Sequence, residues 1–490
     1  MSTATGYARG GRYSTRGAKR ERKQTAAWKQ ILFSLLLLLD LFLLYTIIMQ
    51  LTHQQMAFEA SKGTNLLLLA LFAVGAVASI WAVIRADAWK RLLCLFLIFL
   101  ILYLTFSFSE LPLVKKYREL WISTAMSTMR HQGLATYYLP ASAVELITSR
   151  EQEARDKQVG DNTVGNFTSD ADDHSDWFKP GQQQGLATRE NEKEYESLSK
   201  EQQAFYCLFY ELDINSTEAW FKSHPDCIQN GYEHVLVNET ALGGDGTTIR
   251  TTLGEKVLAI DADNQILIVE VDCDGSRGVM AIGKLPSRLG LYPSSNLPGW
   301  GETAGGIAED NGGILAMNGS GFDDPDGAGN GALLTGWAKC KNGKTYGVHY
   351  GWGYKRLELH KNGWFYIEDA FSTSDEDITD AMEFTPGLII NGNKLDPGIW
   401  TSQNPRATIG QSVRGEILML CVEGRTLSSP GCSVDVCADV LLTHDCITAL
   451  NCDGGTTAIL WYRGEPIIRC SNSAIPEGRY LPNAWVYLGE

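Results

Sequence analysis

The sequence lacks the short motifs that indicate several common kinds of catalytic site. It contains no Cys-x-x-Cys pair, which argues against a zinc ribbon. Its histidines, among them His349, His360 and His444, do not have the spacing of metal ligands. No Gly-x-Ser-x-Gly elbow is present, so the sequence gives no case for a serine hydrolase. We therefore expect no cofactor and no metal ion in the main site.

The chain also lacks an excess of positive charge. Its 490 residues include 42 Lys and Arg against 57 Asp and Glu, which gives a formal net charge of -15. Binding to a nucleic-acid backbone needs a basic surface, so this composition argues against nucleic acid as a partner. Any phosphate group that the protein recognises must be held by a few local Arg or Lys side chains.

Cysteine is nearly absent from the first part of the chain. Of the 11 cysteines, only Cys94 precedes the end of the last long hydrophobic run. Ten cysteines beyond that point predict an oxidising compartment with some disulfides. The alternative, reduced thiols buried in the core, remains open at this stage.

Long hydrophobic runs are present in the first 111 residues. They cover residues 31–51, 66–84 and 92–108. The first two reach the roughly 20 residues that a helix needs to cross a bilayer, and the third does so with its flanks. Residues 31–111 are therefore predicted to form three transmembrane helices, with the lipid bilayer as a partner.

Basic residues predict how these helices are oriented. Residues 1–30 form a basic tail that we expect to be disordered, and Arg85, Lys90 and Arg91 lie in the turn before the third run. The positive-inside rule places both on the cytoplasmic side. We therefore expect a multi-pass cell-membrane protein with a cytoplasmic N-terminus and an extracellular C-terminal domain. A cleaved signal peptide fits poorly, because the first run is too long and no small-residue cleavage site follows it.

One acidic residue, Asp40, lies inside the first hydrophobic run. Carboxylates within membrane helices usually face a partner helix or a cavity. Helix packing, a protonated side chain and a role in transport remain open interpretations, and the first two are favoured.

The rest of the chain is predicted to be an α+β ectodomain, with mixed sheets and inserted helices. We expect a juxtamembrane helix at 112–150, an acidic linker at 151–189, a helical connecting region at 190–250 and the main domain at 251–490. Short apolar segments bounded by Gly, Asn, Asp and Pro predict strands at 256–260, 265–271, 278–282, 313–317, 387–390, 416–422, 459–462 and 485–488. Residues 433–444 predict a helix with Ser433 as its cap.

Near the C-terminus, an apolar run leads into Asn451 and Asp453, two glycines and two threonines, and a second apolar run follows. This pattern predicts strand, tight turn and strand. Gly454 and Gly455 leave room for a ligand, so Asp453 is expected at the edge of a site with backbone N–H groups beside it. An ordinary Asp-Gly hairpin is the alternative.

Companion motifs precede and follow this turn. They are Ala-Met-Asn-Gly-Ser-Gly-Phe at 316–322, Asn-Pro-Arg-Ala-Thr-Ile-Gly at 404–410, Val-Glu-Gly-Arg at 422–425, and Arg479 with Asn483-Ala484 near the end. Together with the Asn-x-Asp-Gly-Gly turn they resemble the phosphodiester glycosidase family, which includes a lysosomal enzyme that removes N-acetylglucosamine from a phosphodiester. Bacterial members are often called exopolysaccharide-biosynthesis proteins. The resemblance covers about residues 256–488.

The resemblance implies a site made of residues from all these motifs. Its expected catalytic residues are Asp453, Arg406 and Asn318, and its expected substrate-binding residues are Gly319, Thr408, Asn451, Gly454, Gly455, Thr457, Arg479 and Asn483. Arg406 suits phosphate oxygens, with Thr408 supporting it through its hydroxyl. Asp453 suits general acid/base or electrostatic work. For Arg479, a structural ion pair is an equally good interpretation.

This sequence departs from the family pattern at several positions. Cys452 stands where the family commonly has Leu, and Thr456 replaces its third Gly. The second change leaves open how closely a substrate approaches residue 456. Cys452 is a candidate for a disulfide with Cys446.

An acidic loop follows the first motif. Asp323, Asp324 and Asp326 lie beside Gly327, so a calcium ion is one candidate ligand, although a solvated turn is favoured because the full calcium-loop pattern is missing. One of these acids is also a candidate for a second catalytic carboxylate.

The leading functional prediction is a membrane-anchored extracellular hydrolase. It would cleave a sugar-1-phosphodiester of the N-acetylglucosamine type on a phosphorylated glycan or cell-surface polymer. Two alternatives from other classes stay open: a non-catalytic surface protein that binds phosphorylated glycans, and a membrane assembly factor for exopolysaccharide.

Overall fold

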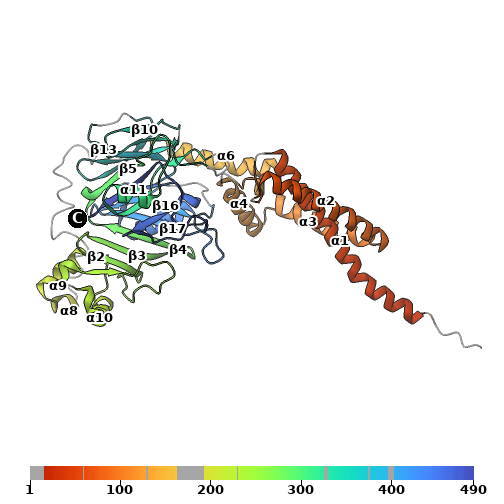
Figure 1. Ribbon diagram of the computed structural model, residues 1–490, viewed down its shortest axis with the longest axis horizontal. Helices are drawn as coiled ribbons and strands as arrows, with labels where there is room; N and C mark the ends of the chain where they lie inside the picture. Colours follow the sequence, from red (N-terminus) through yellow and green to blue (C-terminus); the bar gives the residue numbers. More distant parts are fainter. Residues whose placement is uncertain are drawn as a thin grey trace, which may run out of the picture. The chain divides into compact units, whose positions relative to one another are not determined.

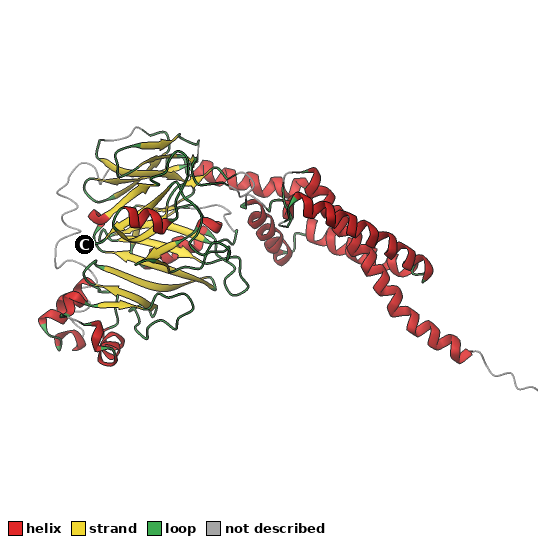
Figure 2. Cartoon of the chain, viewed as in Figure 1, coloured by secondary structure: helices red, strands yellow, loops and turns green. Residues whose placement is uncertain are grey.

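The computed structural model describes most of the chain, and two compact units emerge from it. The described residues are 16–53, 55–58, 60–128, 131–162, 193–228, 230–324, 329–351, 353–372, 376–395 and 402–490. The N-terminal unit comprises residues 1–118 and 130–143, and the C-terminal unit comprises residues 119–129 and 144–490. Helices make up the first and strands dominate the second (Figure 2).

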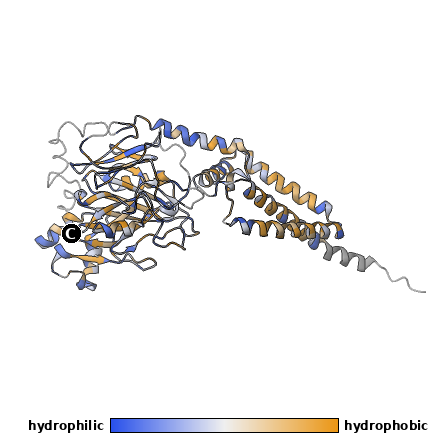
Figure 3. Cartoon of the chain, turned by 45° about the horizontal axis from the view of Figure 1, so that its top comes forward, coloured by the Kyte–Doolittle hydropathy of each residue, from blue (hydrophilic) through white to orange (hydrophobic). Residues whose placement is uncertain are grey.

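Three long helices of the N-terminal unit confirm the three predicted apolar spans. They are α1 (Arg16–Thr52), α2 (Lys62–Arg85) and α3 (Trp89–Phe108). The stretches long and apolar enough to cross a membrane are Ala27–Thr52, Lys62–Arg85 and Trp89–Phe108. Their colouring in Figure 3 is mainly hydrophobic. Many of their large apolar side chains are exposed, as helices that face lipid require.

The N-terminal tail differs from its prediction. Residues 1–30 were expected to be disordered, but α1 already begins at Arg16. After Gly17, the segment up to Lys29 contains no Gly or Pro and is rich in Arg, Lys, Glu, Gln and Ala, which favour helix. The apolar span therefore continues a helix that starts in the basic stretch.

The half-buried carboxylate of Asp40 in the first span is held by the second helix. Ser79 donates a hydrogen bond of 2.7 Å from its hydroxyl to Asp40 Oδ2. At Gly75 a Cβ atom would lie only 3.0 Å from Asp40 Oδ1, so glycine lets the two helices approach at this point. These contacts support the helix-packing interpretation of Asp40.

The predicted juxtamembrane helix is divided. Residues 112–150 were expected to form one helix, but the structure has α4 (Pro112–Met126), α5 (Gly133–Thr136) and α6 (Ala141–Lys157). Because α6 extends to Lys157, it takes in the first part of the predicted linker at 151–189. The acidic part of that linker, from residue 163 onward, lies outside the described residues.

The remaining helices belong to the C-terminal unit. They are α8 (Lys193–Glu196), α9 (Lys200–Leu208), α10 (Ile214–Ser223), α11 (Ala304–Asp310) and α12 (Val434–Thr443). Within the predicted helical region, α9 is separate from α8 and starts after Ser199, whose side chain forms a capping box with Gln202. The prediction for α12 is confirmed, since Ser433 Oγ accepts a hydrogen bond from Val436 N.

Antiparallel sheets form the body of the C-terminal unit. The strands are β1 (Leu236–Asn238), β2 (Lys256–Asp261), β3 (Ile266–Cys273), β4 (Ser276–Gly283), β5 (Leu289–Pro293), β6 (Gly313–Asn318), β7 (Gly321–Phe322), β8 (Leu334–Thr335), β9 (Trp337–Lys339), β10 (Thr345–Gly347), β11 (Lys355–His360), β12 (Phe365–Asp369), β13 (Ile378–Phe384), β14 (Gly387–Ile390), β15 (Asn393–Lys394), β16 (Arg406–Ser412), β17 (Ile417–Val422), β18 (Cys446–Asn451), β19 (Leu460–Tyr462), β20 (Glu465–Pro466) and β21 (Asn483–Leu488). The α+β prediction is confirmed.

One sheet of nine strands is central to this unit, in the order β1-β2-β3-β4-β17-β16-β18-β14-β15. Figure 1 shows β2, β3, β4, β17 and β16 as neighbouring ribbons. Two sheets of five strands have the orders β10-β9-β13-β11-β12 and β20-β19-β6-β21-β5, and β7 pairs with β8.

The nine-stranded sheet is buried on both faces. Along β3, Ile266 and Ile268 belong to one hydrophobic cluster, which also contains Leu460 and Trp485 of a five-stranded sheet. Leu267 and Val269 alternate with them and belong to a second cluster, which includes side chains of α9, α10 and α12. Burial on both faces explains why these strands read as nearly continuous apolar runs.

Candidate active site

The Asn-x-Asp-Gly-Gly turn connects two different sheets. β18, which leads into it, pairs with β16 and β14 of the nine-stranded sheet. β19, which follows it, pairs with β6 and β20 of a five-stranded sheet. The two strands do not pair with each other, so the hairpin alternative is wrong. Asp453 lies where the chain passes from one sheet to the other.

Asn318 holds both ends of this turn. Its Nδ2 donates to the carbonyl oxygen of Asp453 at 2.7 Å, and its Oδ1 accepts from Ile459 N at 3.1 Å. The residue is fully buried at the end of β6. The next residue, Gly319, accepts a hydrogen bond from Asp453 N at 3.4 Å. These bonds give Asn318 the geometry of a positioning residue for Asp453.

Both glycines of the turn are required by close contacts. A Cβ at Gly454 would lie 2.9 Å from the carbonyl oxygen of Pro405, which accepts the N–H of Gly455 at 2.9 Å. Gly455 has a φ of +64°, and a Cβ there would lie 2.9 Å from Arg425 Nη2. The turn is therefore packed tightly against the residues before β16 and after β17.

The Asp453 carboxylate is partly buried, and burial raises its pKa to about 6. Hydrogen bonds from the Thr457 hydroxyl and the Gly454 N–H, together with the charge of Arg479, oppose this increase, whereas the charge of Asp324 adds to it. A carboxyl group with a pKa near neutrality exchanges protons readily at physiological pH.

Arg479 connects this carboxylate with the acidic loop. Its guanidinium forms a bidentate ion pair with Asp324, with Nη2 at 2.8 Å from Oδ1, and donates to the carbonyl oxygen of Gly329 at 2.9 Å. It also lies 4.8 Å from the ring centre of Phe322. The ion-pair interpretation thus describes Arg479, and its charge also acts on Asp453.

A second arginine, Arg425, reaches the turn and was absent from the expected site. Its Nη1 donates to Thr456 Oγ1 at 3.0 Å and its Nη2 to Asn404 Oδ1 at 3.2 Å. The side chain is exposed, and the charge of Asp453 acts on it. The Val-Glu-Gly-Arg motif contained the signal, but the sequence did not indicate which arginine faces the turn.

The structure places Arg406, an expected catalytic residue, inside the protein. This residue is buried, and its guanidinium donates to the carbonyl oxygen of Cys432 at 3.0 Å and to the carbonyl and hydroxyl oxygens of Ser402 at 2.7 and 2.8 Å. Burial lowers its pKa. Because these donors satisfy protein oxygens, Arg406 has the contacts of a residue that stabilises the start of β16.

The Thr408 hydroxyl, expected to support Arg406, makes no hydrogen bond to it among the described residues. Thr408 is opposite Asn451 in the pairing of β16 and β18, and both are buried. Thr408 Oγ1 and Asn451 Oδ1 have no hydrogen-bond partner among the described residues, while Asn451 Nδ2 donates to the carbonyl oxygen of Thr385 at 2.9 Å. These two residues lie within the sheet beside the turn.

Asn483 fixes the backbone that follows Asn318. Its Oδ1 accepts from Ser320 N at 2.8 Å, and its Nδ2 donates to Ser320 Oγ at 3.0 Å. A Cβ at Gly319 would approach Asn483 Oδ1 to 2.4 Å, so only glycine fits there. Asn483 and Gly319 therefore fix the backbone that follows Asn318, next to the Asp453 turn.

The acidic loop gives little support to a calcium site. The carboxylate of Asp324 is neutralised by Arg479 and also accepts from Gly329 N at 2.7 Å. Asp323 is exposed, and Asp326 lies outside the described residues. Within the described ranges, no group of three or more His, Cys, Asp or Glu side chains is arranged to hold a metal ion.

A tyrosine that sequence reasoning missed lies near Asp453. Burial raises the pKa of Tyr354 to about 12, and the charges of Asp453 and Glu383 both contribute. Glu383 is buried and forms a short hydrogen bond with His349, whose ring stacks on Trp337. These residues follow no motif of the sequence, which is why only the folded chain reveals them.

The expected disulfides are not found. All 11 cysteines are free thiols, and eight of them are buried. Cys446 is the first residue of β18 and Cys452 follows its last residue, and an extended strand rises about 3.3 Å per residue, so the candidate disulfide between them is wrong. The buried-thiol alternative describes this structure.

Residues 311–488 match the family model described as phosphodiester glycosidase. The matched segment includes Asn318, Arg425, Asp453 and Arg479. The chain thus carries a segment of the phosphodiester glycosidase type, and the resemblance predicted from the motifs is confirmed for these residues. Residues 256–310, which the predicted resemblance also covered, lie outside the match.

Several solved structures are similar to this chain at low identity. The catalytic domain of zebrafish N-acetylglucosamine-1-phosphodiester alpha-N-acetylglucosaminidase, auto-inhibited by its pro-peptide, is 16% identical over 46% of this chain and 82% of that chain, with a TM-score of 0.38. A hypothetical protein from Synechocystis is 14% identical over 49% and 65%, with a TM-score of 0.33. A putative exported protein from Burkholderia pseudomallei is 12% identical over 47% and 76%, with a TM-score of 0.31. Comparison with curated proteins found no match.

Proposed function

We propose that this protein is a membrane-anchored phosphodiester glycosidase. It hydrolyses the bond between the anomeric carbon of a sugar, of the N-acetylglucosamine type, and a phosphate diester on a glycan or cell-surface polymer. The three N-terminal helices anchor it, with the N-terminus in the cytoplasm and the C-terminal unit outside. The observation that carries the proposal is the Asp453 carboxylate, with a pKa of about 6, beside Arg425 and Arg479.

The chemistry of the leaving group decides what the site must supply. When the bond between the anomeric carbon and oxygen breaks, the oxygen keeps the electron pair and a phosphomonoester dianion leaves. The second pKa of such a phosphate is about 6, so it departs without a strong proton donor. The main requirements are positive charge for the developing dianion and help for the attacking water.

Arg425 and Arg479 are the proposed phosphate contacts. Arg425 is exposed and is oriented by Thr456 and Asn404. Arg479 is held by Asp324. Such fixed guanidinium groups match phosphate oxygens and stabilise charge that appears in the transition state.

Asp453 is the proposed base and electrostatic group. In its ionised form it takes a proton from water as the water oxygen bonds to the anomeric carbon, and it stabilises the positive charge on the sugar ring. Asn318, Gly319, Gly454, Gly455, Thr457 and Asn483 position this carboxylate and the space beside it. Thr408, Asn451 and Arg406 support the strands behind the turn.

The test uses the full chain purified in detergent micelles. It is incubated with an N-acetylglucosamine-1-phosphodiester, and release of the free sugar is measured beside Asp453→Asn. Release by the wild type that is lost in the variant supports the proposal. Binding of the substrate without any turnover would indicate the non-catalytic glycan-binding protein instead.

A second preparation separates the enzyme from the assembly factor. If a chain without the first two spans keeps its hydrolytic activity, the spans serve as an anchor. If both chains fail to hydrolyse the substrate and only the full chain supports polymer export in cells, the assembly role is indicated.

A further inference from the structure

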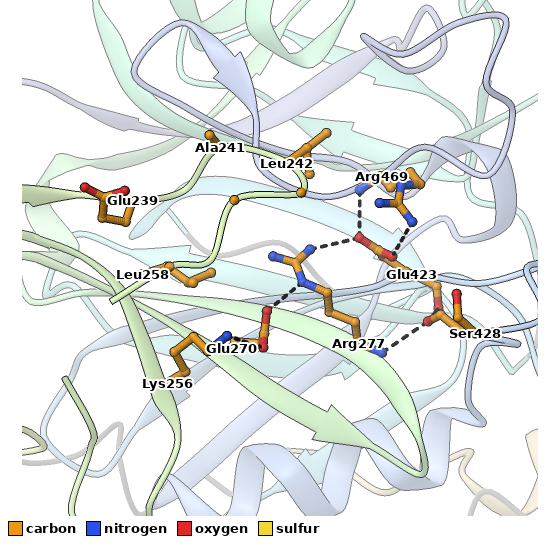
Figure 4. Close-up of a pocket in the computed structure, with 14 residues that line it drawn as sticks. Glu239, Ala241, Leu242, Lys256, Leu258, Glu270, Arg277, Glu423, Ser428 and Arg469 are labelled. Carbon is orange, nitrogen blue, oxygen red and sulfur yellow. Dashed lines mark hydrogen bonds and ion pairs between the residues drawn. The ribbon is translucent and has the colours of Figure 1, made fainter. Parts of the chain in front are cut away.

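The C-terminal unit contains a polar pocket whose lining residues do not include Asp453. Its volume is about 250 Å³. Its lining residues are Glu239, Ala241, Leu242, Gly243, Gly244, Gly246, Lys256, Leu258, Glu270, Arg277, Glu423, Ser428, Ser429 and Arg469. Figure 4 shows their side chains converging from β2, β3, β4, the loop after β1 and the segments that follow β17 and β20. We call it the Arg277 pocket.

The floor of the Arg277 pocket is a rigid network of charges. Arg277 donates from Nε to Glu270 at 2.7 Å and from Nη1 to Glu423 at 2.8 Å. Glu423 is buried and also accepts from Arg469 N at 3.2 Å. These described contacts leave Nη2 of Arg277 with its two N–H donors for a ligand.

A glycine-rich loop forms the opposite wall. Gly243 and Gly246 have φ values of +82° and +66°, and a Cβ at Gly246 would approach Lys256 Cδ to 3.0 Å. Lys256 Nζ donates to the carbonyl oxygen of Asp245 at 3.3 Å. A ligand in the pocket would contact backbone groups of this loop and the exposed side chain of Leu242.

The pocket is lined by equal numbers of cationic and acidic side chains, and this balance favours a neutral polar ligand. Lys256, Arg277 and Arg469 are opposed by Glu239, Glu270 and Glu423. A phosphate dianion would be repelled by the carboxylates, whereas a neutral ligand with hydroxyl groups can both accept from the cations and donate to the acids. Pockets for drug-sized ligands measure about 300–1,000 Å³, so this smaller one suits a single sugar ring.

Two segments that line the pocket also donate hydrogen bonds to Thr456 of the Asp453 turn. Two residues after Glu423, Arg425 donates to Thr456. Two residues after Arg469, Ser471 donates to Thr456 Oγ1 at 3.3 Å. A chain of sugars bound at the turn would therefore contact segments that also line the Arg277 pocket.

We propose that the Arg277 pocket is an accessory subsite that binds one ring of a neutral glycan next to the candidate active site. Arg277 and Arg469 donate to its hydroxyl or carbonyl oxygens, and Glu239 and Glu270 accept from its hydroxyl groups. The choice of ligand rests on the proposed function, but binding to this pocket can be measured without any turnover.

The experiment measures the binding of N,N′-diacetylchitobiose to the full chain in detergent micelles by calorimetry, in an Asp453→Asn background. Two variants change the pocket: Arg469→Gln removes a donor, and Leu242→Trp narrows the entrance. Leu253→Trp is the matched control, because Leu242 and Leu253 are both exposed leucines, at 42% and 57%, and only the first lines the pocket. Inorganic phosphate is titrated in parallel.

Arg469→Gln is expected to weaken binding of the disaccharide about tenfold, the loss of one hydrogen bond to a charged group. Leu242→Trp is expected to weaken binding by blocking the entrance, while Leu253→Trp leaves it unchanged. Equal binding in all variants would overturn the subsite. Binding of phosphate in place of the disaccharide, lost in Arg469→Gln, would overturn the assignment to a neutral glycan. Failure of the proposed function appears separately, as absence of hydrolysis of a short phosphodiester by the chain with an intact Asp453.

Discussion

Two arginines at the ends of neighbouring strands of one sheet, Arg406 and Arg425, have opposite surroundings. Arg406 begins β16 and is opposite Val422 of β17, whereas Arg425 follows β17 by three residues. The first is buried and donates to protein oxygens, and the second is exposed and donates to the Asp453 turn. Both belong to motifs of the same family resemblance. A motif therefore identifies the neighbourhood of a site without indicating which side chain faces the ligand.

The alternation of side chains along a strand explains this difference. Ala407 and Ile409 of β16 pack into the cluster shared with the five-stranded sheets, so Arg406 points to the opposite face. Arg425 lies beyond the end of β17 and has a φ of +63°. It has left the alternation of the strand, and its side chain is free to turn toward Thr456.

The largest effect is expected at the Asp453 carboxylate, beside Arg425 and Arg479. Asp453→Asn should lower kcat for a sugar phosphodiester by about 1,000-fold, because the proposed base is lost. Sugar release by the full chain in detergent measures it. Asp310→Asn, a change in an exposed acid at the end of α11, is the control and should leave kcat unchanged. Full activity of Asp453→Asn would remove Asp453 from the mechanism.

Arg406→Ala tests whether the buried arginine acts on stability and not on the substrate. The change leaves carbonyl oxygens of Ser402 and Cys432 without their donor, so we expect it to lower the free energy of unfolding by about 3 kcal/mol. Urea unfolding of the full chain, followed by tryptophan fluorescence, measures this. The protein that remains folded should keep its kcat. A loss of kcat at unchanged stability would show that Arg406 acts on the substrate after all.

The raised pKa of Asp453 predicts a pH-dependent stability. The folded-state pKa is about 6 against an ordinary value of 3.8, so the folded protein binds this proton more tightly than the unfolded chain. Ionisation of Asp453 therefore lowers the free energy of unfolding above pH 6. This loss becomes smaller as the pH falls toward 4 and vanishes below that. Asp453→Asn should therefore stabilise the protein at pH 8, by about 3 kcal/mol more than at pH 3.5. Parallel urea titrations at the two pH values test this, and a difference independent of pH would contradict it.

Arg425→Gln tests the exposed member of the pair. We expect kcat/KM to fall about 100-fold through loss of charge stabilisation, with a change in stability within about 0.5 kcal/mol. Lys361→Gln, at an exposed lysine, is the control. If Arg425→Gln destabilised the protein as much as Arg406→Ala and left kcat/KM of the folded protein unchanged, the distinction between the two arginines would be wrong.

The smallest effect is expected at Thr456, which replaces the third glycine of the family pattern. Its hydroxyl accepts from Arg425 at 3.0 Å. Thr456→Gly removes this bond and the one that the hydroxyl accepts from Ser471 at 3.3 Å, so KM should rise about threefold with kcat nearly unchanged. Thr252→Gly, at an exposed turn of the same unit, is the control and should leave KM unchanged. A lower KM in Thr456→Gly would mean that the hydroxyl obstructs the substrate.

Strands with apolar runs could be predicted from the sequence, and strands built from paired charges could not. The prediction of 256–260 matches β2, and that of 387–390 matches β14. β11, however, contains Lys355, Arg356 and Glu358, which are buried and paired, Lys355 with Asp369 at 2.8 Å and Arg356 with Glu358 at 2.6 Å. A search for hydrophobic periodicity does not detect a strand whose buried side chains are charged.

The sequence by itself determined the features that depend on local composition and spacing. These are three apolar helices, the strands around the motifs, the cap at Ser433 and the presence of an Asp-Gly-Gly turn. Their physical basis is short in range: burial of apolar runs, capping, and the backbone freedom of glycine. Asp453 could be singled out because its motif contains the whole turn.

Only the tertiary structure decided which distant side chains meet at that turn. The chain crosses there from one sheet to another, and Asn318, Arg425 and Arg479 reach it from three separate segments. The burial of Arg406, the pairing of Arg479 with Asp324 and the polar pocket at Arg277 follow from strand order and side-chain direction. These depend on packing between residues far apart in sequence, which no local pattern specifies.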